Sequence, residues 1–184
     1  MSATASATTP TPRRVPNPVA FALVGLGALL GVLSLTVLPW FRAVGAIRST
    51  DTVSDIRELL DDLISRRREL GTRSAFHLGL SEYYYSWLAW LLLAAAVIIA
   101  LVAAFPTREG GQVRMLGFLV SGLGVVATVW ALDVYRPGHH TPGVDPGPSF
   151  ADFAAHMSFG AWAALLAFVL LGLAAVLGPR RVRA

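Results

Sequence analysis

Histidine and carboxylate side chains gather in one loop-like segment of the chain, at His139, His140, Asp145, Asp152 and His156. Asp152 and His156 would share a face if their segment is helical, because they are four residues apart. Imidazole and carboxylate groups suit zinc or copper. However, tandem histidines cannot easily place both rings on one ion, and no established ligand spacing is matched. His139, His140, Asp152 and His156 are therefore only weak metal candidates, and a solvated loop with a helix-capping aspartate is the favoured interpretation.

Other kinds of reactive site are missing from the sequence. The chain has no cysteine, which excludes disulfides, thiolate nucleophiles and iron–sulfur clusters. It has no Walker-type loop, no Ser–His–Asp arrangement and no HExxH motif. These absences favour a non-enzymatic protein without a bound cofactor, and they leave an enzymatic site in the loops as the alternative.

A second arrangement, in the segment after the first apolar run, favours binding rather than catalysis. Apolar residues recur there at helical spacing, from Val53 and Ile56 to Leu60 and Leu63, and they predict an amphipathic helix over 52–70. Acidic residues crowd its start and arginines its end, which complements the helix dipole. The predicted partner-binding residues are Leu60, Leu63, Arg66, Arg67 and Arg68. An alternative left open is that this helix only covers the end of a bundle or lies on lipid headgroups.

The two segments that carry these residues are predicted to connect membrane spans. The chain is 55% hydrophobic and 14% charged, and its mean hydropathy is +0.61. Uncharged runs long enough to cross the hydrocarbon core predict four spans, at 19–38, 87–105, 115–132 and 157–178. The predicted fold is all-α: an integral membrane four-helix bundle with an additional amphipathic helix in the first extramembrane loop. A cleaved signal peptide is the alternative for the first span, but that span is longer than a signal sequence requires.

The remaining segments are expected outside the hydrocarbon core. Residues 1–18 are rich in Ser, Thr, Ala and Pro and predict a disordered tail. The segments 39–86 and 133–156 are loops on one side of the membrane, 106–114 is a turn on the other side, and 179–184 is a basic tail. An aromatic belt is expected at the start of the second span, from Tyr83-Tyr84-Tyr85, Trp87 and Trp90.

Arginine placement predicts the orientation. All 15 basic residues are arginine, and they flank the start of the first span, the turn at 106–114 and the end of the last span. The positive-inside rule puts these places, and both termini, in the cytoplasm, although the loop at 39–86 also carries arginines. The expected location is the cytoplasmic membrane. The net charge of +4 suits anionic lipid headgroups, and no nucleic-acid partner is expected because the arginines are scattered.

Small residues recur at a spacing that lets helices approach closely. Each pair is separated by three residues, and the predicted helix-packing positions are Gly27, Gly31, Gly117, Ser121, Gly160 and Ala164. The favoured interpretation is packing within the bundle, and the alternative is homo-oligomerisation.

Two short motifs carry a resemblance. Leu38-Pro39-Trp40-Phe41 closes the first span, and Ser158-Phe159-Gly160-Ala161-Trp162 opens the last. With the order of loop, hairpin and loop between them, the chain resembles small four-pass actinobacterial membrane proteins, most of them uncharacterised. The resemblance implies the four-pass layout and no particular activity.

The expected function is that of a non-enzymatic accessory or scaffold protein that binds a membrane partner through its extracytoplasmic loops. Proton relays, ion pathways and voltage sensors need ionisable groups or broken helices inside the membrane, and the predicted spans carry no charge. A metal-binding or enzymatic site in the loops is the alternative, and a small transporter component is a further one.

Overall fold

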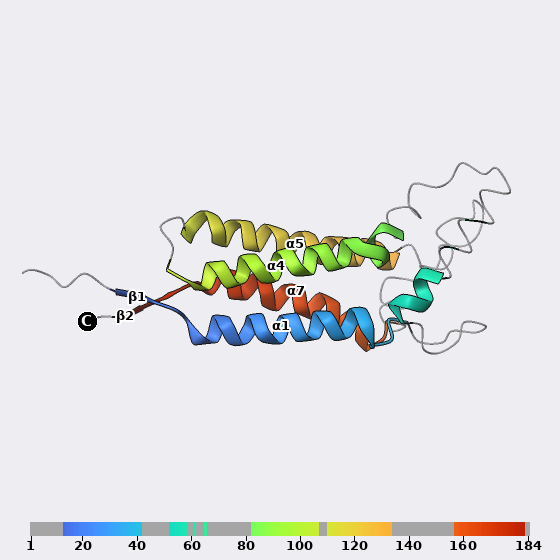
Figure 1. Ribbon diagram of the computed structural model, residues 1–184, viewed down its shortest axis with the longest axis horizontal. Helices are drawn as coiled ribbons and strands as arrows, with labels where there is room; N and C mark the ends of the chain where they lie inside the picture. The colour runs from blue at the N-terminus through green and yellow to red at the C-terminus, as the bar shows by residue number, and fades with distance from the viewer. Residues whose placement is uncertain are drawn as a thin grey trace, which may run out of the picture.

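The computed structural model describes residues 13–41, 52–58, 61, 65, 82–106, 110–133 and 157–182. Its core is a bundle of antiparallel helices that lie side by side along the long axis (Figure 1). The elements in chain order are β1 (Arg13–Val15), α1 (Pro18–Thr36), the π-helical turn η1 (Tyr84–Leu88), α4 (Ala89–Ala104), α5 (Gly110–Asp133), α7 (Phe159–Leu177) and β2 (Arg180–Val182). Four helices are long and apolar enough to cross a membrane, η1 and α4 forming one of them. The predicted all-α four-helix membrane bundle is confirmed.

The first helix has clear start and stop signals. Asn17 caps it, because its side-chain oxygen accepts a hydrogen bond from the Val19 amide at 3.1 Å. Pro18 occupies the first turn, where its missing N–H costs nothing. The helix gives way before Pro39, which cannot continue the hydrogen-bond ladder.

The bundle is packed with small side chains inside and large ones outside. Helix α7 contacts α1, α4 and α5. Half of its residues are buried inside the bundle, whereas one-third of those of α1 are. The residues that α4 and α7 bury are largely alanine and glycine, whereas exposed leucine, valine and phenylalanine side chains cover the outside. This arrangement suits lipid, because helices in a membrane associate by close packing rather than by the hydrophobic effect.

The two strands join the ends of the chain. β1 pairs with β2 antiparallel, with Arg14 opposite Arg181 and Val15 opposite Arg180. The sequence predicts no regular structure for the tails, and the structure differs from this expectation at β1 and β2. Each strand forms because the other strand, 165 to 169 residues away in the sequence, lies beside it. Cross-strand backbone hydrogen bonds depend on such a neighbour, which local composition cannot indicate. We call this the ribbon end of the bundle and the opposite end the loop end.

The aromatic cluster at the start of the second span differs from the expected belt. Tyr84 and Tyr85 are buried in the core, while Tyr83, Trp87 and Trp90 are exposed. The π-helical turn widens the helix at this point. Two of the tyrosines therefore join the packing between helices instead of facing the membrane interface.

Candidate functional site at the loop end

A network of hydrogen bonds fastens the end of α1 to the start of α7. The Trp40 indole Nε1–H donates to the Ser34 carbonyl at 2.8 Å, and the Ser34 hydroxyl donates to the Gly160 carbonyl at 2.7 Å. In return, the Gly160 amide donates to the Pro39 carbonyl and the Ser158 amide to the Trp40 carbonyl, each at 2.8 Å. We call Ser34, Pro39, Trp40, Ser158 and Gly160 the clasp. It satisfies backbone groups that helix ends leave unpaired.

The clasp requires glycine at position 160. A Cβ atom there would lie 2.6 Å from Cδ1 of Trp40 and 2.7 Å from the carbonyl oxygens of Leu38 and Pro39. Two of these three obstacles are backbone atoms, which cannot rotate away. The clasp therefore unites the two motifs on which the resemblance to four-pass proteins depends.

A second polar pair joins the other two spans. The Thr128 hydroxyl donates to the Gly124 carbonyl at 2.7 Å, so the Tyr84 hydroxyl is the donor in its own 2.7 Å bond to Thr128. The Trp40 ring meets Tyr84 and Tyr85 edge-on, with centroids 6.2 and 5.4 Å away. These buried groups are uncharged and paired with one another, which is typical of a structural network.

A short loop helix, residues 53–58, lies on top of this network (Figure 1). Val53 is 6% exposed and Ile56 is 1% exposed, and both belong to the same core cluster as Trp40, Tyr84 and Tyr85. The apolar side of the loop helix is therefore already occupied by the bundle. The side chains that it leaves exposed are polar or charged.

Asp55 caps the start of the loop helix. Asp55 accepts hydrogen bonds from the Thr52 hydroxyl at 2.7 Å and from the Thr52 amide at 2.9 Å. These bonds favour the ionised carboxylate and hold the pKa of Asp55 below its ordinary value. The cap fixes the direction in which the helix leaves the bundle.

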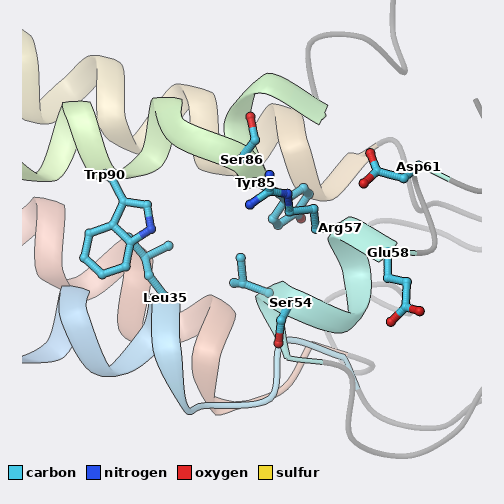
Figure 2. A pocket seen from close by; sticks show the side chains of 9 residues that line it. Leu35, Ser54, Arg57, Glu58, Asp61, Tyr85, Ser86 and Trp90 are labelled. Carbon is cyan, nitrogen blue, oxygen red and sulfur yellow. The ribbon is translucent and has the colours of Figure 1, made fainter.

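Between the loop helix and the start of the second span is an open hollow of about 320 Å³ (Figure 2). Leu35 and Trp90 form its apolar side. Arg57 reaches across it toward Tyr85 and Ser86 of η1, whereas Glu58 points away to the rim (Figure 2). The further lining residues are Val53, Ser54, Asp61, Tyr85 and Ser86. An apolar wall beside exposed charges can receive an amphipathic segment or a long side chain with a charged tip.

The described residues that line the hollow supply hydroxyl, carboxylate and guanidinium groups beside apolar side chains. In the part of the chain that the structure describes, no three His, Asp or Glu side chains lie close enough to hold a metal ion. The hollow is a candidate binding site.

The small residues singled out in the sequence lie at contacts between helices. A Cβ atom at Gly27 would meet Leu171 and the Ala167 carbonyl, and one at Gly31 would meet Leu93. Gly117 faces Ala175 in the same way, and Ala164 is buried. The Ser121 hydroxyl is buried against Gly172 and has no hydrogen-bond partner among the described residues.

Several predicted site residues lie outside the described residues. They are the partner-binding candidates Leu60, Leu63, Arg66, Arg67 and Arg68, and the metal candidates His139, His140, Asp152 and His156. The residues that the structure adds are the lining of the hollow and the clasp. The Trp40 motif was a signal for the clasp, but nothing local indicates that Ser34 bonds to Gly160.

No protein-family model matches the chain, and no curated protein or solved structure shows significant similarity to it.

Proposed function

We propose that this protein is a non-enzymatic accessory or scaffold protein of the cytoplasmic membrane, and that it binds a membrane partner through its extracytoplasmic loops. The observation that carries the proposal is the position of the loop helix. Val53 and Ile56 anchor it to the bundle, so its exposed face is held rigidly beside the hollow. A rigid, charged surface next to an apolar pocket is suited to recognition, because little conformational entropy is lost on binding.

The partner is expected to match both sides of the hollow. An apolar group of the partner would contact Leu35 and Trp90, and a polar or basic group would meet the rim at Glu58 and Asp61. The arginines that follow in the sequence, Arg66 to Arg68, extend the same loop and suit ion pairs at an interface. The predicted spans at 19–38, 87–105, 115–132 and 157–178 carry no charged residue with which to conduct ions or protons, which suits an anchoring role.

The first test is photo-crosslinking in the native membrane. A photoreactive residue at position 58 or 61 should form a specific adduct with one membrane protein, which is either a partner or a second copy. The control is the same residue at Ile98, which is 61% exposed on the flank of α4 and is expected to face lipid.

The second test is reversal of charge. Changing Arg66, Arg67 and Arg68 together to Glu should abolish co-purification of that protein in mild detergent and leave membrane insertion unchanged. If the native protein is alone and monomeric under the mildest conditions, and the triple variant behaves identically, the accessory function is refuted. A self-contained activity in the loops would then take its place.

A further inference from the structure

The charges of the described residues are divided between the two ends of the bundle. The acidic residues, which are Asp55, Glu58, Asp61, Glu82 and Asp133, all belong to the loop end. Apart from Arg57, the arginines belong to the ribbon end (Figure 1), and they are Arg13, Arg14, Arg114, Arg180 and Arg181. Within the described chain, the ribbon end therefore holds positive charge without a neighbouring carboxylate.

Arg114 is the arginine of this end that is set into the bundle. It lies in the first turns of α5 and is partly buried. Its Nε atom is buried, and no hydrogen-bond partner for it exists among the described residues. A guanidinium is always charged and carries donors in a fixed plane, so a buried donor without an acceptor is unfavourable. Nε itself is closed to an external ligand, but Arg114 as a whole is only partly buried, so the exposed part of its guanidinium is open to an anion from outside the chain.

The guanidinium of Arg114 packs against Gly178. This residue has φ +54° and ends α7, in a region of backbone conformation that favours glycine. A Cβ atom there would overlap Nε and Cζ of Arg114, so the guanidinium lies directly on the glycine backbone. Pro179 is buried next to it and Arg180 is exposed. The guanidinium of Arg114 is thus held between the end of α7 and the start of β2.

The paired strands bring further charge to the same end. Their register sets Arg14 opposite Arg181, with Arg13 and Arg180 at the two neighbouring positions. The register therefore brings four arginine positions to the end of the bundle at which α5 begins (Figure 1).

We propose that the ribbon end, to which β1 and β2 bring four arginine positions, binds the phosphate group of an anionic glycerophospholipid, with Arg114 on Gly178 as the main contact. A guanidinium matches phosphate oxygens with two parallel hydrogen bonds. A lipid is the source of the phosphate because α5 is a membrane span and the residues beside Arg114 face outward. Met115 is 66% exposed and Leu116 is 51% exposed, which gives the acyl chains an apolar surface.

The test measures retention of spin-labelled phosphatidylglycerol by the full chain in phosphatidylcholine vesicles. The wild type should immobilise more labelled phosphatidylglycerol than labelled phosphatidylcholine. Arg114→Gln should weaken this preference about tenfold, which is the effect of losing one charge-assisted contact. Arg114→Lys keeps the charge but loses the planar fork, so it should fall between the two. The matched control is Arg57→Gln at the loop end, which should leave the preference for labelled phosphatidylglycerol unchanged.

Equal retention of the two lipids by the wild type would overturn the proposal. So would an unchanged preference in Arg114→Gln, or an equal loss in Arg57→Gln, because the attraction would then come from overall charge. Inorganic phosphate is the competing source, and displacement of the labelled lipid by millimolar phosphate would show a site for the free anion instead. If Arg114→Gln does not insert, Arg114→Lys decides, because wild-type preference in that variant contradicts a contact made by the guanidinium.

Discussion

Asp55 shows how a single residue sets the start of the loop helix. Its carboxylate accepts hydrogen bonds from both the hydroxyl and the amide of Thr52. Protonation of the carboxylate would therefore weaken the acceptor on which the cap depends. Because its pKa in the folded protein lies below the ordinary value of 3.8, ionised Asp55 stabilises the cap. That contribution is complete above pH 3.8 and is lost as the pH falls through the lower, folded value.

We expect an NMR titration of the Asp55 carboxyl carbon in detergent to give a pKa below 3.8. The Thr52→Val variant removes the hydroxyl donor, which is the largest cause of the lowered pKa, and should move the midpoint up toward the ordinary value. The amide of Ile56 should exchange faster in that variant, because its bond to the Thr52 carbonyl belongs to the same turn. A midpoint at or above 3.8 in the wild type would contradict the cap.

Gly160 is the second position at which one residue decides a contact. Gly160→Ala places a methyl group against two backbone carbonyls and the Trp40 ring, and overpacking of this kind costs roughly 1–3 kcal/mol. The apparent melting temperature in detergent should fall. The matched control is Gly122→Ala, where a Cβ atom meets nothing within 4 Å, and there the melting temperature should hold or rise because alanine is the better helix former. Equal behaviour of the two variants would mean that the clasp does not form in solution.

At the scale of elements, the loop helix depends on its contact with the bundle. A helix this short is not stable alone in water, so the burial of Val53 and Ile56 is what keeps it folded. The amphipathic pattern indicates which face is apolar. It does not indicate whether that face meets lipid, a partner or the bundle. In the structure, Val53 and Ile56 pack against the bundle.

Ile56→Asp should release the loop helix, because an unpaired charge in this cluster costs roughly 3 kcal/mol or more. We expect faster proteolysis of the loop in a detergent-solubilised sample, with insertion of the spans unchanged. Ser54→Asp is the control, since Ser54 is exposed on the same turn and an acidic residue suits a helix start. Leu60→Asp should act like Ile56→Asp if the same stripe continues. Unchanged protease resistance in Ile56→Asp would refute the docking.

At the scale of the whole molecule, the strand pair holds residues 13–15 and 180–182 together at one end of the four-helix bundle, so we expect both to lie on one side of the membrane. The arginines of the ribbon end favour the cytoplasm for that side. A reporter that is active only outside the membrane should therefore be active when fused after Gly71 and silent when fused after Ala184. The opposite pattern would reverse the orientation, and activity at both positions would contradict the four-span layout.

The sequence alone determined the number of spans and the class of fold. A bilayer leaves no partner for an exposed backbone group, so a long apolar run has to be helical wherever it lies in the chain. The helix bounds differ from the predicted ones: α5 begins at Gly110 rather than at position 115, whereas α7 covers Phe159–Leu177 and is shorter than the predicted 157–178. Local composition also indicated an apolar face in the first loop, since the period of a helix is a local property.

Only the tertiary structure decided which neighbours the polar groups found. Ser34 and Gly160 are 126 residues apart, and neither their types nor their spacing indicates that they meet. The same holds for Tyr84 with Thr128 and for Arg114 with Gly178. Hydrogen bonds and close contacts of this kind depend on how helices are placed side by side, which a pattern along one helix does not encode. The hollow at the loop end and the contact of Arg114 with Gly178 at the ribbon end both arise from that placement.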